Sequence, residues 1–77
     1  MHILYDSPSY FVAEFPGHDG IELVDKLARR GGYLEGEVEV QFRASMEQFA
    51  SHRPSEALMD EFLANYDALL TQSVLLH

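Results

Sequence analysis

Hydrophobic and polar residues alternate in the first part of the chain and recur at helical spacing in the second part. In the stretch YFVAEF, Phe11, Ala13 and Phe15 share one side of an extended strand, and we expect Phe11 and Phe15 to lie in the core. The preceding run HILY is also typical of a strand, and DSPS between the two runs is a turn cluster. The pattern therefore predicts an N-terminal β-hairpin.

The next stretch, IELVDKLARRGGYLEG, fits two structures. A helix would place Ile21, Val24, Leu27 and Ala28 on one side, with Gly31 at its end. A second hairpin would instead use IELVDK and GGYLEG as strands and LARR as their connection. The periodicity alone does not decide between them.

The first predicted helix begins after Gly36. Its apolar stripe spans about 80° of a helical wheel and consists of Val38, Phe42, Met46 and Phe49. Val40 falls outside this stripe, so we expect it to be exposed or to contact a partner.

The second predicted helix opens at Pro54 or Ser55, after the stretch SHRPS. Its apolar arc is wide, about 140°, and consists of Leu58, Met59, Phe62, Leu63, Tyr66, Leu69 and Leu70. The chain then ends in an apolar tail, residues 73–77, that contains Val74, Leu75 and Leu76.

These elements predict a single α+β domain over residues 1–77, with a small antiparallel sheet packed by two amphipathic helices. Residues 1–36 form the β-rich half, residues 37–72 the two-helix half, and residues 73–77 the tail. The expected core consists of Ile3, Phe11, Phe15, Val24, Leu34, Phe42, Met46, Phe49, Leu58, Phe62, Tyr66, Leu69 and Leu70.

Composition limits the classes of function. Thirteen acidic and five basic residues give a net charge of −8, which opposes binding to nucleic acids and to anionic membrane surfaces. No apolar run is long enough to span a bilayer, and the first residues do not resemble a signal peptide. The chain has no cysteine, which is typical of a reducing compartment. We therefore expect a cytoplasmic protein that binds neither nucleic acid nor membrane.

Candidate chemistry is sparse. The four histidines lack the spacing of metal ligands, and no nucleophile or phosphate-binding motif is present. Glu56, Asp60 and Asp67 lie along one border of the second helix, where paired carboxylates can serve acid–base or metal chemistry. Such border acids are more often solvated, so we expect no catalytic residue, metal or cofactor.

Three of the five basic residues, Lys26, Arg29 and Arg30, fall within five positions. They could meet an acidic partner or a phosphate. A helix end or a hairpin turn explains them equally well, and we favour that structural explanation.

Three stretches resemble a betaproteobacterial family of short proteins of unknown function, domain-of-unknown-function family 3567. They are YDSPSYFVAEFP, IELVDKLARRGGYLEG and DEFLANYDALLTQSVLLH. The resemblance implies a compact α+β domain and supplies no activity. It also favours the second hairpin, because relatives often have β-branched or aromatic residues in the GGYLEG segment. Gly31 and Gly32 depart from that pattern.

The first functional hypothesis is a non-enzymatic protein-interaction module that either forms a homodimer or binds an unidentified protein. Its candidate contact residues are Val40, Met59, Leu63, Leu70, Val74, Leu75, Leu76, Lys26, Arg29 and Arg30. The alternative is a small-ligand or metal-binding regulator, or an enzyme, that uses the border formed by Glu56, Asp60 and Asp67.

Overall fold

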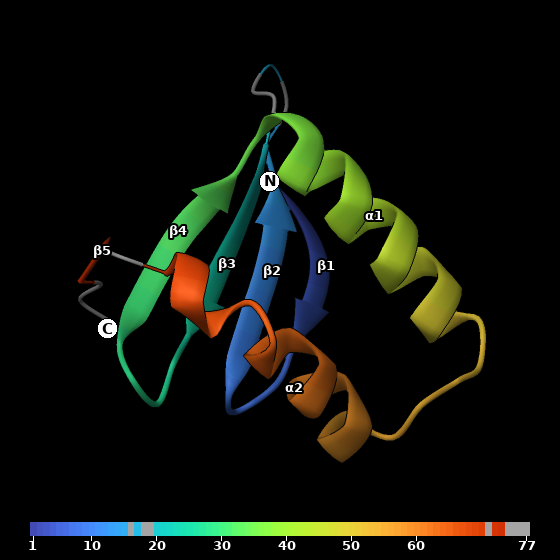
Figure 1. The fold of residues 1–77 in the computed structure, drawn as a ribbon. Coiled ribbons are helices and arrows are strands. Elements are labelled where there is room, and N and C mark those ends of the chain that lie inside the picture. Colours follow the sequence, from blue (N-terminus) through green and yellow to red (C-terminus); the bar gives the residue numbers. More distant parts are fainter. Residues whose placement is uncertain (16, 18–19, 71, 74–77) are drawn as a thin grey trace.

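A meandering antiparallel sheet is covered on one side by two helices (Figure 1). The computed structural model describes residues 1–15, 17, 20–70 and 72–73, the last two as backbone. Within these residues the sheet runs in the order β1-β2-β3-β4-β5. Its strands are β1 (His2–Asp6), β2 (Tyr10–Glu14), β3 (Ile21–Asp25), β4 (Arg30–Leu34) and β5 (Gln72–Ser73). The helices are α1 (Gly36–Ala50), α2 (Glu56–Ala64) and the short 3-10 helix η1 (Asp67–Leu69). The predicted α+β fold is confirmed.

The ambiguous middle stretch is a hairpin. β3 and β4 pair antiparallel from Ile21 opposite Leu34 to Asp25 opposite Arg30. A turn joins the two strands, and Arg29 at its end adopts the left-handed conformation with φ of 56°. The helical alternative for residues 21–30 is therefore wrong.

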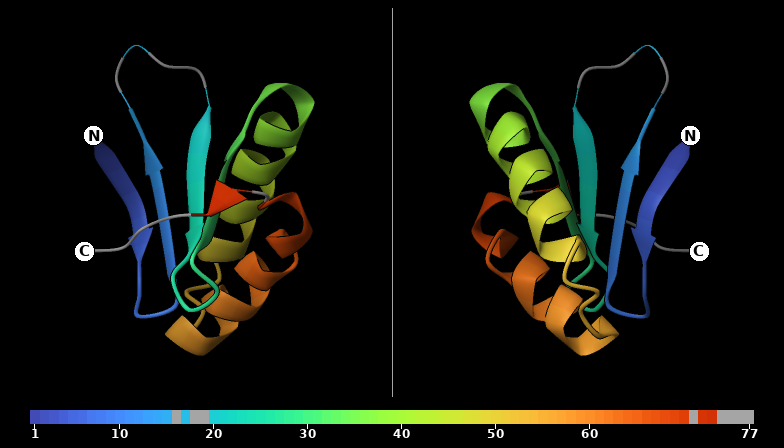
Figure 2. Two further views of the ribbon diagram at one scale, coloured as in Figure 1. Left: turned by 90° about the vertical axis from the view of Figure 1, so that its left-hand side faces the viewer. Right: turned by 90° about the vertical axis from the view of Figure 1, so that its right-hand side faces the viewer.

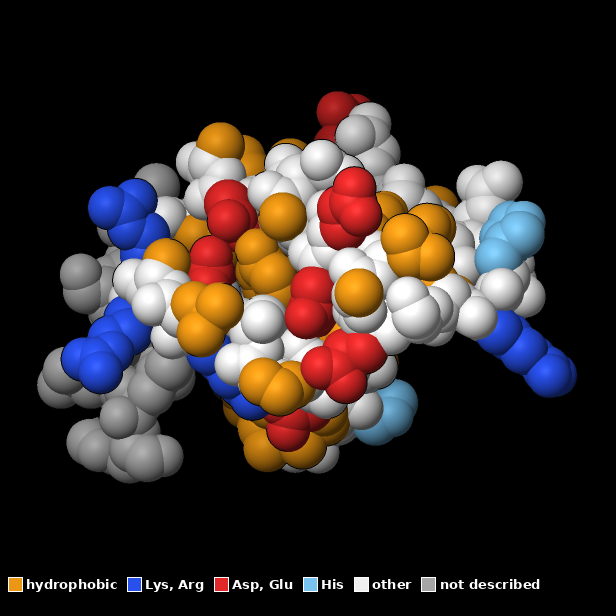
Figure 3. Space-filling view, turned by 90° about the horizontal axis from the view of Figure 1, so that it is seen from below, with side chains coloured by type: hydrophobic (Ala, Val, Ile, Leu, Met, Phe, Trp, Pro, Cys, Tyr) orange, Lys and Arg blue, Asp and Glu red, His pale blue; other side chains and the backbone are white. Residues whose placement is uncertain are grey.

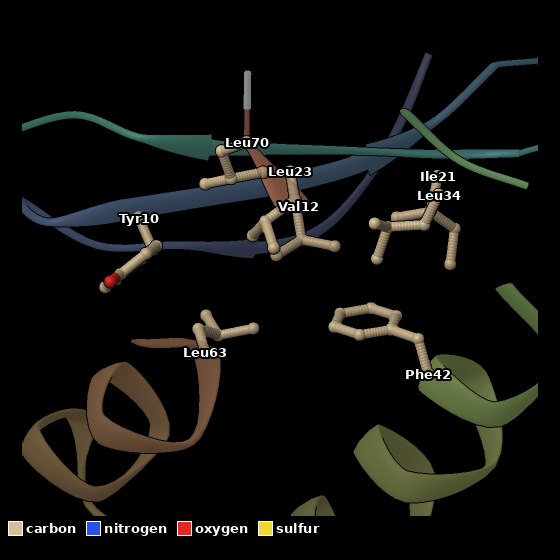
Figure 4. Close-up of a cluster of buried hydrophobic side chains, with 8 residues drawn as sticks. All are labelled: Tyr10, Val12, Ile21, Leu23, Leu34, Phe42, Leu63 and Leu70. Atoms are coloured by element: carbon tan, nitrogen blue, oxygen red, sulfur yellow. The ribbon is translucent and has the colours of Figure 1, made fainter. Parts of the chain in front are cut away.

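The core lies between the sheet and the helices (Figure 4). Phe42 from α1 and Leu63 from α2 are fully buried against residues that point from the sheet. The sheet side of this cluster consists of Tyr10, Val12, Ile21, Leu23 and Leu34, and Leu70 completes it.

The strand β2 alternates as expected, but its other side faces the helices. Tyr10 and Val12 belong to the core, whereas Phe11 is only partly buried on the opposite side. The polar groups on this side of β2 form hydrogen bonds with residues of the helical layer. The Tyr10 hydroxyl donates to Asp67, and Glu14 accepts a hydrogen bond from Arg43 on α1. The expectation that Phe11 lies in the core between sheet and helices is therefore wrong.

The second helix starts as predicted and ends early. The hydroxyl of Ser55 accepts a hydrogen bond from the Leu58 backbone N–H at 3.2 Å, which caps α2. The helix stops at Ala64 and η1 follows. A helix that packs on one side buries a stripe nearer 100° than 140°, and Leu58 and Leu69 stay 50% and 46% exposed. Placing these two leucines in the core is therefore wrong.

The other apolar positions of the predicted elements also include both buried and exposed residues. On α1 Phe42 is buried, Met46 and Phe49 are partly buried, and Val38 is 41% exposed. Val40 is 68% exposed, which confirms that it lies off the apolar stripe. On β1, at the edge of the sheet, Ile3 is 47% exposed, which contradicts its placement in the core.

Gly32 lets the chain after η1 cross β4. A Cβ atom built on Gly32 would lie 3.2 Å from the Leu69 carbonyl oxygen and 3.6 Å from Leu70 Cδ2. The segment then reaches β5, where Gln72 pairs with Gly31 and Ser73 with Arg30. Ser73, the first residue of the tail, thus lies in an edge strand of the sheet. Val74, Leu75 and Leu76 lie outside the described residues.

The sheet side away from the helices carries no described helix (Figure 2). We call it the outer face. Strand alternation and the pairing registers place on it Ile3, Asp6, Phe11, Ala13, Glu22, Val24, Gly31 and Tyr33.

Candidate functional site

The two helices meet through a pair of aromatic rings. Phe49 near the end of α1 and Phe62 on α2 stack with their centroids 5.0 Å apart and their planes inclined by 10°. Phe62 also contacts Tyr66 edge-on at 5.7 Å, which ties the pair to the core. Both phenylalanines are only partly buried, so part of each ring faces solvent.

Two hollows of about 270 Å³ each share this ring pair in their walls. One is lined by Phe49, Leu58, Glu61, Phe62 and Asn65. The other is lined by Ser45, Gln48, Phe49, His52 and Phe62. We call the two hollows together the helix groove. Its apolar floor and polar walls are typical of a surface that accepts an apolar side chain from a partner.

The helix groove lies in an acidic layer. Residues 56–70 contain Glu56, Asp60, Glu61 and Asp67 and no Lys or Arg. On α1 the only cation is Arg43, whose guanidinium donates to Glu39 at 2.7 Å and to Glu14 at 2.8 Å. The end of the molecule that carries α2 shows Asp and Glu side chains among hydrophobic patches, with most Lys and Arg toward its margins (Figure 3). The helical layer is therefore acidic, and Glu61 is the acid that lines the groove.

Two of the three border carboxylates hold α2 and η1 to the N-terminal hairpin. Asp60 Oδ1 accepts hydrogen bonds from the Ser7 hydroxyl at 2.8 Å and from the Tyr5 hydroxyl at 3.0 Å. Asp67 Oδ1 accepts one from the Tyr10 hydroxyl at 2.8 Å. Glu56 is exposed at the start of α2. The border is therefore a structural contact, and its carboxylates do not converge on one point.

A separate cleft of about 380 Å³ lies between the β3–β4 turn and η1. Its lining includes Asp25, Arg30 and Asp67. Burial raises the pKa of Asp67, and the nearby charge of Asp25 raises it further. Asp25 accepts a hydrogen bond from the Ala28 backbone N–H at 3.0 Å, which shapes the turn. Among the described residues no three His, Asp or Glu side chains are placed to hold a metal ion.

The basic cluster belongs to the turn of the second hairpin. The Lys26 ammonium bonds to the Asp6 carboxylate and donates to the Ser7 carbonyl oxygen at 2.7 Å, so it joins the two hairpin turns. Arg29 and Arg30 are exposed, Arg29 in the turn and Arg30 at the start of β4. The structural explanation accounts for Lys26 through these bonds.

The other candidate contact residues do not form one surface. Met59 and Leu63 belong to α2, and Leu70 follows η1. Met59, Leu63 and Leu70 lie in the core at 6%, 0% and 2% exposure. This differs from the expectation that they offer apolar surface to a partner. Val40 is exposed on α1 as expected, and Val74, Leu75 and Leu76 lie outside the described residues.

Phe49, Leu58 and Phe62 form the exposed apolar surface that sequence reasoning missed. All three fit the helical stripes and were therefore assigned to the core. The width of the arc on the second helix was a signal, since a helix packed on one side cannot bury an arc of about 140°.

Comparisons with known proteins agree with the resemblance noted from the sequence. A curated protein of Burkholderia thailandensis, Protein BTH_I0359, is 41% identical over 85 residues, and the match covers 100% of both chains. No solved structure matches the chain. None of the described helices is long and apolar enough to cross a membrane. The model of a family described as "Protein of unknown function (DUF3567)" matches residues 1–77, and the chain therefore belongs to this family.

Proposed function

We propose that this protein is a non-enzymatic interaction module that binds a basic, amphipathic segment of another protein in the helix groove. The observation that carries the proposal is the stacked pair of Phe49 and Phe62, which stays partly open to solvent between two hollows. Partly exposed aromatic rings in concave surfaces are typical anchors of protein interfaces.

The acidic residues around the helix groove indicate the charge of the partner. Glu61 lines the groove, and residues 56–70 carry four acids without a base. A segment with apolar residues at helical spacing and flanking Lys or Arg side chains would fill the hollows and meet these acids. A second copy of the same chain, with a net charge of −8, would be repelled.

Leu58 provides the test. It lines the groove and is 50% exposed, so Leu58→Asp should leave the fold intact and place a charge at the groove. Val40→Asp is the matched control, since Val40 is also an exposed apolar residue of the helical layer and lies outside the lining of the groove.

A photo-reactive phenylalanine analogue placed at position 58 or at position 40 in the native cell would capture neighbours at each site. We expect a basic partner to be captured from position 58 and not from position 40. Binding of that purified partner should weaken at least tenfold in Leu58→Asp and stay unchanged in Val40→Asp. The same products from both positions, or capture of a second copy of this chain, would contradict the proposal.

The alternative, a regulator that binds a metal or small ligand at Glu56, Asp60 and Asp67, has less support. Asp60 and Asp67 already accept hydrogen bonds from the hairpin, and their exchange for a ligand would break that contact. Calorimetric titration with Zn²⁺, Mn²⁺ and Mg²⁺ separates the two functions, because the interaction module is expected to give no specific heat with any of them.

A further inference from the structure

The turn between β3 and β4 presents an exposed leucine beside two exposed arginines (Figure 1). We call residues 27–30 the hairpin tip. Leu27 is 78% exposed, and Arg29 and Arg30 are exposed next to it. A single exposed leucine is ordinary on a protein surface. Two positive charges beside it make the hairpin tip a mixed apolar and basic surface.

Hydrogen bonds hold the hairpin tip in one conformation. Asp25 is buried, and its Oδ1 accepts from the Ala28 backbone N–H at 3.0 Å. On the other side, the Lys26 backbone N–H donates to the Ser9 carbonyl oxygen at 2.8 Å, which braces the tip against the first turn. A turn that is already ordered loses little conformational entropy when it binds a partner.

Arg29 occupies a position that suits a different residue. Its φ of 56° lies in the left-handed region, which glycine and asparagine adopt at lower cost than arginine does. Stability of the turn therefore does not explain why an arginine stands here. Strained residues of this kind are often retained for a function of their side chain.

The two arginines of the hairpin tip also lack a role inside the described part of the molecule. Lys26 and Arg43 each form ion pairs with acids of the same chain. Among the described residues, neither Arg29 nor Arg30 forms such a pair. The hairpin tip is thus a local basic surface on a chain with a net charge of −8.

The combination of one apolar side chain and two arginines indicates the class of the partner. Nucleic acids and anionic membranes are bound by many cations, and they repel a chain with a net charge of −8. A pocket on a protein offers both an apolar site for Leu27 and carboxylates for the two guanidinium groups. A second copy of this chain has the same negative charge and would be repelled.

We propose that the hairpin tip is a second interaction surface, which binds an acidic pocket on a partner protein. Leu27 is its apolar anchor, and Arg29 and Arg30 pair with carboxylates of that protein. None of the residues 27–30 lines the helix groove, so the two surfaces are separate. Their opposite charges select different partners.

Photo-crosslinking in the native cell tests the proposal first. A photo-reactive phenylalanine analogue at position 28 leaves Leu27 and both arginines in place. Position 40 is the control, because Val40 is an exposed residue of α1. We expect position 28 to capture a protein that position 40 does not capture, with the crosslink mapped by mass spectrometry to an acid-rich segment.

Variants of the hairpin tip then test its chemistry with the purified captured protein. Arg29→Asn combined with Arg30→Gln removes both charges, and asparagine accepts the left-handed conformation. The matched control is Arg53→Asn, since Arg53 is also exposed and left-handed, with φ of 51°. Binding should weaken by about tenfold or more in the double variant and in Leu27→Ser, and it should stay unchanged in the control.

Two further measurements separate lost binding from lost folding. The double variant should melt at the same temperature as the native protein or higher, because asparagine relieves the strain at position 29. Added sodium chloride should weaken binding of the native protein, because salt screens exposed ion pairs.

Five outcomes would overturn the proposal. Position 28 could capture nothing beyond the products of position 40, a second copy of this chain, or a segment without acids. Binding of the captured protein could survive the double variant. Finally, phosphatidylserine vesicles or single-stranded DNA could retain the native protein and not the double variant, which would assign the hairpin tip to phosphate groups instead.

Discussion

Tyr10 on β2 donates its hydroxyl to Asp67 Oδ1 at 2.8 Å, across 57 positions of sequence. The bond joins the N-terminal hairpin to η1 at the point where the chain turns back over the sheet. Burial raises the pKa of the Tyr10 hydroxyl, and the hydrogen bond to Asp67 raises it further, so this donor keeps its proton well above neutral pH.

Tyr10→Phe removes the hydroxyl and leaves the ring in the core. We expect the free energy of unfolding to fall by about 1–2 kcal/mol, because the Asp67 carboxylate loses its donor. Urea titration followed by circular dichroism measures the change. Tyr33→Phe is the control, since Tyr33 is 52% exposed, and its effect should stay within about 0.5 kcal/mol. Equal effects of the two substitutions would mean that the Tyr10–Asp67 bond adds nothing to stability.

Asp67 makes stability depend on pH. Its folded pKa is raised above the ordinary value of 3.8, chiefly by burial, so the folded protein binds a proton more tightly there than the unfolded chain does. Stability from this group is therefore greatest below pH 3.8 and is lost as the pH rises through the folded pKa.

Asp67→Asn should remove this loss, because the amide oxygen can still accept from Tyr10 and has no charge to repel Asp25. We expect the variant to melt at a higher temperature than the native protein at pH 7, and the difference to shrink toward pH 3. Melting curves recorded from pH 3 to pH 8 give the comparison. A variant that melts lower than the native protein at pH 7 would show that the charged form of Asp67 is the favourable one.

Ser7 links the first turn to α2. Ser7 is buried, at 6% exposure, and its hydroxyl donates to Asp60 at 2.8 Å. Its oxygen accepts from the backbone N–H groups of Tyr10 at 3.0 Å and Ser9 at 3.2 Å. Ser7→Ala should lower the free energy of unfolding by about 1–3 kcal/mol, because all three partners lose a bond. The control is Ser9→Ala, since the Ser9 hydroxyl makes no hydrogen bond to other described side chains or backbone. Chemical denaturation that gives the same midpoint for both variants would contradict this account.

Gly32→Ala tests whether the close approach of Leu69 and Leu70 to β4 requires a glycine. Alanine has the better strand propensity, but its Cβ atom would press on the Leu69 carbonyl oxygen at 3.2 Å, and a backbone atom yields little. We expect a loss of about 1–3 kcal/mol from overpacking and faster hydrogen exchange at the Leu70 amide. That amide donates to the Asp67 carbonyl oxygen at 3.0 Å and so reports on the shifted segment. A gain in stability would show that the segment has room to move.

Much of the fold follows from local pattern. The alternation in β2, the start of α1 and the opening of α2 at Pro54 or Ser55 are set by neighbouring residues. The structure confirms the first two predictions and decides the third in favour of Ser55. The family resemblance favoured a hairpin over a helix for residues 21–30, and periodicity did not.

The remaining features depend on contacts between distant residues. Tyr10 and Val12 on the helical side of β2 pack in the core, and Tyr10 and Glu14 bond to Asp67 and Arg43. Alternation alone cannot show which side of β2 makes these contacts. The close approach of Leu69 to Gly32 likewise joins segments more than thirty residues apart. The helix groove was missed for the same reason, because exposure of Phe49 and Phe62 depends on where the helices end.

The register of β1 shifts between Ile3 and Tyr5, so this border strand carries a bulge in its middle. A bulged border presents an uneven row of amide and carbonyl groups and makes a poor template for another chain. Addition of a strand from another chain is therefore obstructed at this edge of the sheet.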